Sequence, residues 1–357
     1  SEQLAAVANL GADYASTLAA VDGVVGNSSS GICEAASFGV PVVNVGERQR
    51  GRLRGANVID SGYGRDELQG AIREALLNPI EDDPLPSLLT PGMKLTIAFD
   101  DISLPLPQMQ KPDVRQRIIE AVLDLAAEAG VDDVHLIAAL ALHRRMTEAE
   151  LRHCLGDRIY DAFAPQGALY NHDAEDPEGM VELGLTRHDE QVTMNRRAAE
   201  SDLLVYVNLN IVSMDGGWKS TATGLSGYTG IRHHHNVATM RESKSFMDRH
   251  SSELHHSNWR QGEVIKAHGP RVFQIETTIN NNTFGYDGPL HVLQKREWEW
   301  SARDRATFVG MQKGLDAMPA SARRRIFQSW KAPYELTSVQ AGEVEAVHER
   351  TLQHCFD

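Results

Sequence analysis

Short apolar runs alternate with amphipathic segments along most of the chain. The runs of strand length are 93–101, 134–143, 202–211 and 270–279. The segments with helical periodicity are 114–130, 147–156 with Thr147 as its cap, and 304–318. Strands and helices that alternate at these lengths predict an α/β fold, with a doubly wound, mostly parallel sheet and flanking helices.

A smaller unit is predicted at the start of the chain. Residues 21–47 have the pattern of a strand, a turn rich in glycine and serine, a short helix and a second strand, which together make a βαβ segment. Residues 67–77 predict an amphipathic helix, and 78–92 is rich in proline and aspartate, as a linker or long loop is. We therefore expect a first domain over 1–69 and a larger one from residue 70 onward.

Composition is typical of a soluble globular protein. A length of 357 residues favours two domains, and 41% of the residues are hydrophobic and 24% charged. The sequence has no apolar run near the roughly 20 residues of a membrane span and no signal peptide at its start, so we expect a cytoplasmic protein. The three cysteines are odd in number and form no CxxC pair, which predicts ordinary thiols at Cys33, Cys154 and Cys355.

The formal net charge of −14 argues against nucleic acid as a partner, because a polyanion would be repelled. One basic cluster departs from this trend, at Arg48, Arg50, Arg52 and Arg54. Such a run is either a solvated surface or a site for an anion, and the sequence leaves both open. It also leaves open whether the chain forms a homo-oligomer.

Chemically active side chains follow the predicted strands. In open parallel sheets, ligands bind at the carboxyl ends of the strands. The residues expected there are Asp100 and Asp101, then His143, then the loop 214–224, then His233 to His235. Each signal alone is weak: a single histidine is more often structural, the GGWKS stretch lacks the full glycine pattern of a phosphate-binding loop, and the three histidines are either metal ligands or a polar loop.

Taken together, these segments resemble the nickel-pincer lactate racemase family in order and spacing. The matching stretches are NPIEDDPLPSL, FDDISLPLP, ALHRRMTEAEL, NRRAAESDLLVYV, GGWKS, and the histidine sixteen residues beyond the lysine of GGWKS. The resemblance extends over residues 70–250 and again near VQAGEVEAVHERTLQHC. It implies a catalytic α/β domain over 70–330, followed over 331–357 by a linker or the start of a C-terminal domain.

The resemblance also implies roles for individual residues. Lys219 would form the covalent link to the nickel-pincer nucleotide, in a loop with Gly216, Gly217 and Ser220, and His235 would bind the nickel. His143 would be one of two histidines that move the substrate proton, and Asp101 would belong to the substrate-binding loop. The substrate implied is a small 2-hydroxy acid or a related hydroxy compound.

This chemistry suits the residue types. Inversion of a carbon that bears a hydroxyl removes hydrogen from one face and returns it to the other, which calls for a hydride acceptor and a base for the hydroxyl proton. Imidazole serves both as a base near neutral pH and as a ligand of nickel. A tethering lysine fixes the cofactor, so that only the substrate needs to be positioned.

Three departures from the family pattern bear on this hypothesis. Leu104 replaces the arginine that would clamp a substrate carboxylate through two hydrogen bonds. The second proton-transfer histidine, expected about ten residues before Lys219, is missing; His172 is either its substitute or a structural residue. The chain stops at Asp357, so we expect the active-site residues of a second domain to be absent.

The first seventy residues carry a separate resemblance. The stretch GNSSSGICEAASFGVPVVNVGERQRGR is similar to the nucleotide-binding segment of UDP-N-acetylglucosamine 2-epimerases. The resemblance implies contacts to UDP or a UDP-sugar from Ser28, Ser29, Gly31 and Glu34. It covers only the tail of that family's second domain, so the segment is a nucleotide-binding appendage, a remnant of gene fusion, or an element that only packs.

Three functional hypotheses follow. The first is an isomerase, a racemase or epimerase of a hydroxy acid, with nickel and the nickel-pincer nucleotide. The second is a binding or regulatory homologue that keeps the fold without the chemistry. The third is a UDP-sugar-binding protein related to the 2-epimerases.

Overall fold

The computed structural model divides the chain into two compact units, Ser1–Leu68 and Gln69–Asp357. The residues that the structure describes are 16–17, 24–26, 35, 42–45, 58–61, 65–102, 108–279, 289–329, 331–332 and 336–356. The predicted contacts Ser28, Ser29, Gly31 and Glu34, the cluster of arginines from Arg48 to Arg54, and Leu104 lie outside them.

The first unit contains a small parallel sheet. Its strands are β1 (Val24–Gly26), β2 (Val42–Val45) and β3 (Val58–Ser61), in the order β1-β2-β3. Two of these strands lie within the segment predicted to be βαβ, and their parallel pairing agrees with that topology. The helix predicted after them is α3 (Arg65–Leu77), which begins two residues earlier than expected.

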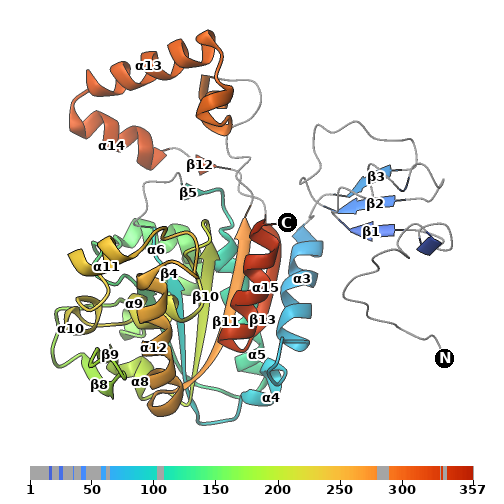
Figure 1. Cartoon of the computed structure of the whole chain (residues 1–357). Helices are drawn as coiled ribbons and strands as arrows, with labels where there is room; N and C mark the ends of the chain where they lie inside the picture. The colour runs from blue at the N-terminus through green and yellow to red at the C-terminus, as the bar shows by residue number, and fades with distance from the viewer. Residues whose placement is uncertain are drawn as a thin grey trace. The chain divides into compact units, whose positions relative to one another are not determined.

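The second unit is built on a six-stranded sheet with the order β13-β11-β10-β4-β6-β7. All neighbouring strands are parallel except β13, which is antiparallel to β11. The strands are β4 (Lys94–Asp100), β6 (Asp133–Ala139), β7 (Leu169–Asn171), β10 (Leu203–Asn210), β11 (Arg271–Ile279) and β13 (Leu336–Gly342). The predicted doubly wound, mostly parallel fold is confirmed, as Figure 1 shows.

Helices cover both faces of this sheet (Figure 1). Those before β10 are α4 (Leu85–Leu88), α5 (Val114–Glu128), α6 (Glu148–Leu155), α7 (Asp157–Phe163), the 3₁₀ turn η3 (Ala164–Gln166) and α8 (Arg196–Ala199). Those after it are α9 (Trp218–Gly224), α10 (Tyr228–Ile231), α11 (Val237–Glu242), α12 (Glu253–His268) and α15 (Val344–Phe356). A capping box starts α6 at Thr147, as predicted, because the threonine hydroxyl and the Glu150 carboxylate each accept a backbone N–H.

The central strand β10 shows why the sheet is buried on both faces. All eight of its residues are buried, as expected for a parallel strand between two helical layers. On one face, Leu204 and Tyr206 pack in a cluster with Trp218 of α9 and Ile265 of α12. Alternate side chains point to opposite faces of a strand, so the residues between them face the other layer, where α5 contacts β10.

The order of the strands predicts where a ligand binds to the main sheet. From β4 the chain moves outward through β6 and β7, then returns to pair β10 with β4 and continues outward to β11. The strand order therefore reverses between β4 and β10. In open α/β sheets, a crevice forms at the carboxyl ends of the two strands that flank such a reversal.

The end of the chain corrects one expectation. A linker or the start of another domain was expected over 331–357, but β13 forms the edge of the main sheet and α15 packs against β11 and β13. Most of the residues between β11 and β13 that the structure describes form η4 (Pro289–Gln294), η5 (Glu297–Glu299), α13 (Ala302–Asp316) and α14 (Ala320–Ser329). Strand β13 was not predicted from the sequence, because the residues of the strand do not alternate clearly between buried and half-buried positions.

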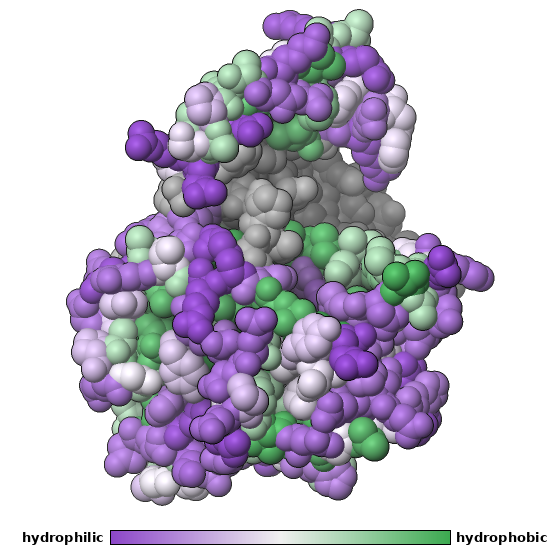
Figure 2. Space-filling view, turned by 90° about the vertical axis from the view of Figure 1, so that its left-hand side faces the viewer, coloured by the Kyte–Doolittle hydropathy of each residue, from purple (hydrophilic) through white to green (hydrophobic). Residues whose placement is uncertain are grey.

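Other elements were also missed. The hairpin β8 (Met180–Leu185) and β9 (Gln191–Asn195) is antiparallel, and β5 (Gln108–Met109) pairs with β12 (Lys331–Ala332). None of the helices in the described part of the chain has both the length and the apolar character that a membrane crossing demands. Figure 2 shows hydrophilic side chains over most of the visible face, with apolar patches between them.

Candidate functional site

The end of β4 is fixed by a buried ion pair. Arg115 is held by Asp113, with 2.7 Å between Nη2 and Oδ2. Its Nη1 donates to the backbone carbonyls of Asp100, at 2.8 Å, and Asp101, at 2.9 Å. Because a buried guanidinium with an acidic partner holds its geometry well, these bonds set the direction in which both aspartates leave the strand.

Asp100 is a carboxyl group with an unusual acidity. Its oxygens accept hydrogen bonds from the Tyr206 hydroxyl, at 3.1 Å, and the Leu209 N–H, at 2.8 Å. Burial raises its pKa to about 7, with further increases from the charges of Asp215 and Asp101, against the Leu209 hydrogen bond and the charge of Lys219, which lower it. A carboxyl with such a pKa can exchange protons near neutrality.

His143 and Asp101 form a pair after the carboxyl ends of β6 and β4. His143 Nδ1 lies 3.1 Å from Asp101 Oδ2, and the histidine side chain is 52% exposed. The hydrogen bond to Asp101 raises the pKa of His143 above its ordinary value, against the effect of partial burial. Ala141, two residues before His143, has a φ of 51°, a strained conformation for alanine that turns the chain sharply after β6.

The loop that carries His143 is anchored from its far end. Arg144 donates two hydrogen bonds, of 2.8 and 2.7 Å, to the two oxygens of Glu150. The same carboxylate accepts the Thr147 N–H at 2.8 Å. The start of α6 therefore fixes the loop on which the imidazole is presented.

Lys219 follows the loop after β10, in the first turn of α9. Its Nζ lies 2.8 Å from Asp215 Oδ1, and both side chains are mostly buried. Asn210 Nδ2 donates to the Asp215 carbonyl at 2.7 Å, which ties this loop to the end of the strand. The amine thus projects from the first turn of α9 toward the carboxyl ends of β4 and β10.

The two glycines before Lys219 are required by close packing. Gly216 has a φ of 93° and Gly217 a φ of 55°, which favour glycine. A Cβ on Gly216 would lie 2.5 Å from Glu276 Oε1. Ser220 points inward, where its hydroxyl donates to Asn208 Oδ1 at 3.0 Å, so it supports the loop from below.

His235 lies in the electrostatic range of this group. Burial lowers its pKa first, followed by the positive charges of Lys219 and His143. Its Nδ1 is 2.8 Å from His234 Nδ1, and we find no hydrogen bond at its Nε2 among the described residues. An imidazole nitrogen within electrostatic range of a primary amine is compatible with a lysine-linked cofactor that holds nickel. In the described part of the chain, no three histidine, cysteine or acidic residues group closely enough to hold a metal ion by themselves.

His172 is buried and hydrogen-bonded at both ring nitrogens, unlike the half-exposed candidate base His143. It is 2% exposed, its Nε2 donates to the Ser226 carbonyl at 2.9 Å, and its Nδ1 accepts from Asn195 Nδ2 at 3.3 Å. Burial lowers its pKa. Because both ring nitrogens are hydrogen-bonded to protein groups, we infer that His172 is a structural residue and not the second base.

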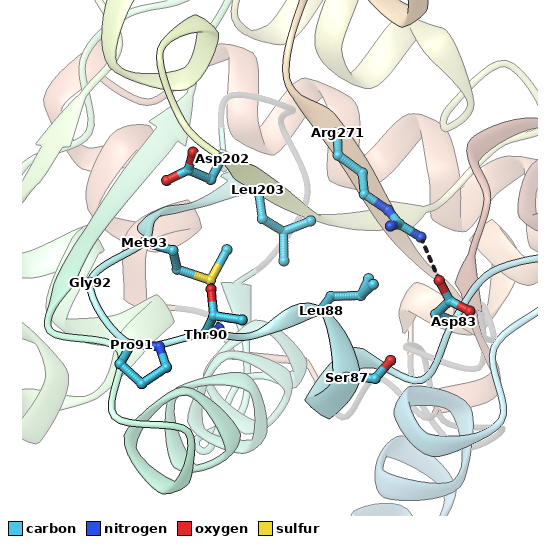
Figure 3. A pocket seen from close by; sticks show the side chains of 10 residues that line it. All are labelled: Asp83, Ser87, Leu88, Thr90, Pro91, Gly92, Met93, Asp202, Leu203 and Arg271. Carbon is cyan, nitrogen blue, oxygen red and sulfur yellow. Dashed lines mark hydrogen bonds and ion pairs between the residues drawn. The ribbon is translucent and has the colours of Figure 1, made fainter.

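A polar cavity of about 570 Å³ lies at the other end of the sheet, and Figure 3 shows its lining. Leu203 and Arg271, which line it, are the first residues of β10 and β11. Arg271 pairs there with Asp82 and Asp83. Since catalytic groups gather at the carboxyl ends of the strands, this cavity is separate from the candidate site.

Sequence reasoning missed three residues of the site region. Asp215 could have been found, because it is an acidic residue only four positions before Lys219, in the loop that leads into α9. Glu276 also leaves a signal, as an acidic residue inside an otherwise uncharged strand interior that is buried from Val272 to Thr278. His348, on α15, leaves none, because only the fold brings the end of the chain to this loop.

Comparisons with known proteins show which families the chain resembles. A family model described as the lactate racemase N-terminal domain matches residues 55–248, and one described as UDP-N-acetylglucosamine 2-epimerase matches residues 2–85. The lactate racemase of Lactiplantibacillus plantarum is 24% identical over 216 residues, which are 59% of this chain and 47% of that protein. The chain therefore spans about half the length of this relative.

Two further known proteins are similar to parts of this chain. The UDP-N,N'-diacetylbacillosamine 2-epimerase (hydrolyzing) of Legionella pneumophila is 51% identical over 67 residues, which are 19% of this chain and 18% of that protein. The lactate racemase apoprotein of Thermoanaerobacterium thermosaccharolyticum shares the fold, with a TM-score of 0.53 and 17% identity over 80% of this chain and 54% of that one.

Both resemblances seen in the sequence are confirmed by these matches. The racemase match covers more than half of the chain and contains every residue of the candidate site from Asp100 to His235. The epimerase match is confined to the start. The chain belongs to the family defined by the lactate racemase N-terminal domain.

Proposed function

We propose that this protein is an isomerase, a racemase or epimerase of a 2-hydroxy acid or a related hydroxy compound, which uses a nickel-pincer nucleotide linked to Lys219. The observation that carries the proposal is the grouping of an amine, two imidazoles and acidic side chains where the strand order reverses. The charge of Lys219 lowers the pKa of Asp100, His143 and His235, so each of these three groups lies within electrostatic range of the amine.

Each residue has a part in the proposed reaction. Lys219 would hold the cofactor, with its amine kept in place by Asp215, and His235 would offer Nε2 to the nickel. When bound, the cofactor supplies a hydride acceptor. His143 would take the proton of the substrate hydroxyl and return it, because Asp101 orients its ring and raises its pKa.

The proposed reaction also needs a second group that transfers a proton. A histidine is missing before Lys219, and His172 is engaged elsewhere. Asp100 supplies an acidic group at the same crevice whose pKa of about 7 suits proton exchange at neutral pH. We propose that it serves as the second acid or base, from the side of the crevice formed by β4.

The proposed substrate class rests on the sequence of the predicted substrate-binding loop. With Leu104 in place of an arginine, the two-pronged contact to a carboxylate is lost. We therefore propose that the substrate is recognised mainly through its hydroxyl, which widens the class from lactate to other hydroxy acids and hydroxy compounds.

The proposal is tested by measuring whether the protein carries the cofactor. The protein, produced in cells that synthesise the nickel-pincer nucleotide, should contain nickel by elemental analysis and show added mass on the peptide that contains Lys219. The variant Lys219→Arg keeps the positive charge and should lose the added mass. Protein with neither nickel nor an adduct would overturn the proposal.

A second candidate function is supported by the same departures from the family pattern. A homologue that binds a ligand without turnover would need neither the arginine replaced by Leu104 nor the missing histidine. Incubation of the loaded protein with single enantiomers of several hydroxy acids separates the two. Formation of the opposite enantiomer supports the isomerase, and binding without inversion supports the alternative.

For the first unit, we propose a site for UDP or a UDP-sugar, on the 51% identity to a UDP-sugar epimerase over 67 residues. The expected contacts are the serines and the glutamate named above. UDP should raise the melting temperature of the protein, and Ser29→Ala should reduce that rise. An unchanged rise in the variant, or none in the wild type, would assign the segment to packing alone.

A further inference from the structure

Beneath the turn that carries Lys219 lies a buried histidine from the last helix. His348 on α15 is 1% exposed, and its Nδ1 lies 3.2 Å from Glu276 Oε2. A carboxylate only accepts hydrogen bonds, so Nδ1–H is the donor. The other ring nitrogen, Nε2, is buried and has no hydrogen-bond partner among the described residues.

The carboxylate of Glu276 accepts hydrogen bonds from four residues. Its Oε1 accepts the Gly217 N–H at 2.6 Å and Gln274 Nε2 at 3.2 Å. Its Oε2 accepts Asn210 Nδ2 at 3.2 Å and His348 Nδ1 at the same distance. One fully buried carboxylate thus joins β10, β11 and α15 to the backbone two residues before Lys219.

The helix α15 also touches this turn directly. A Cβ on Gly217 would lie 2.9 Å from His348 Cδ2, so the imidazole packs against the glycine. On the next residue, the indole Nε1 of Trp218 donates to Glu345 Oε1 at 3.1 Å. Both residues before Lys219 are therefore held by side chains of α15, which lies beside β11 (Figure 1).

We propose that α15 is a positioning element for Lys219, with His348 and Glu276 as positioning residues that fix the Gly216–Gly217 turn. This inference rests on the proposed function of Lys219 as the attachment point of a cofactor. A flexible lysine side chain delivers its amine to one place only if its backbone is fixed, because each loose torsion spreads the amine over more positions.

The experiment uses the full chain without cofactor. His348→Leu removes the donor to Glu276, whereas His348→Asn keeps an N–H that can reach it. Hydrogen exchange of the peptide that contains Gly217 should be at least tenfold faster in His348→Leu and within twofold of the wild type in His348→Asn. Peptides from β6 serve as the reference, because they report on opening of the whole sheet.

A second readout follows the amine. Acetylation of Lys219 by a small active ester, measured by mass spectrometry against Lys313 on α13, should be at least threefold faster in His348→Leu, because the amine is less firmly held beside Asp215. Glu345→Ala lies at the edge of the core, so it should fold even if His348→Leu does not, and it should shift both readouts in the same direction by a smaller factor.

The outcomes separate this inference from the proposed function. Exchange at Gly217 and acetylation of Lys219 within twofold of the wild type in His348→Leu and Glu345→Ala would overturn it, as would equally faster exchange in β6. A positive result here, together with no cofactor on Lys219 in loaded cells, would leave the positioning role in place and overturn the proposed function alone.

Discussion

The raised pKa of Asp100 should make the free energy of unfolding depend on pH. The substitution Asp100→Asn should remove the contribution of this carboxyl group. Asp100→Asn resembles the protonated side chain, because its carbonyl oxygen can accept the Leu209 N–H while its amide donates to the Tyr206 hydroxyl, which can also accept. The variant therefore keeps the hydrogen bonds of the neutral acid and removes the charge that appears on ionisation.

The magnitude follows from the pKa. Burial raises it from the ordinary 3.8 to about 7. Between these values the native carboxyl is protonated while that of the unfolded chain is ionised, so the native state binds more protons and the free energy of unfolding falls as the pH rises. At about 1.4 kcal/mol per pH unit, the loss reaches about 4 kcal/mol above pH 7.

Urea denaturation at a series of pH values from 4 to 9 measures the effect. The variant and the wild type should be about equally stable near pH 4, and the variant should be more stable by about 4 kcal/mol at pH 8. The matched change Asp124→Asn, at an exposed position of α5, should leave the difference between pH 4 and pH 8 as in the wild type. A stability gap between Asp100→Asn and the wild type that does not change with pH would refute the reasoning.

Three further predictions concern other contacts. Arg260→Leu removes the two hydrogen bonds, of 2.9 and 2.7 Å, that Arg260 donates to the buried carboxylate of Glu190, together with its opposite charge, and should cost about 3–5 kcal/mol by urea denaturation; a loss below about 1 kcal/mol would contradict this. Asp101→Asn should lower the pKa of His143, which that carboxylate raises, and an NMR titration with an unchanged midpoint would rule it out. Thr147→Ala removes a helix cap and should lower the free energy of unfolding by about 1 kcal/mol, a value that thermal denaturation can check against no change at all.

Local signals were sufficient for four strands of the six-stranded sheet, β4, β6, β10 and β11. The cap at Thr147 and the apolar run of β10 each depend on neighbours in sequence, and both elements form where the pattern predicts them. The turn after β6 differs. The strand was expected to continue to His143, but it ends at Ala139, because Ala141 turns the chain with a positive φ that no sequence pattern marks.

What the sequence determined by itself is the alternation of strands and helices, the parallel sheet, and the residue types at the strand ends, since these rest on periodicity and on local capping. Only the tertiary structure decided which of them meet. The pairing of β10 with β4 brings Lys219 to Asp100, and the return of α15 to β11 places His348 under the lysine turn. These contacts join residues far apart in the chain, and packing rather than local pattern sets them.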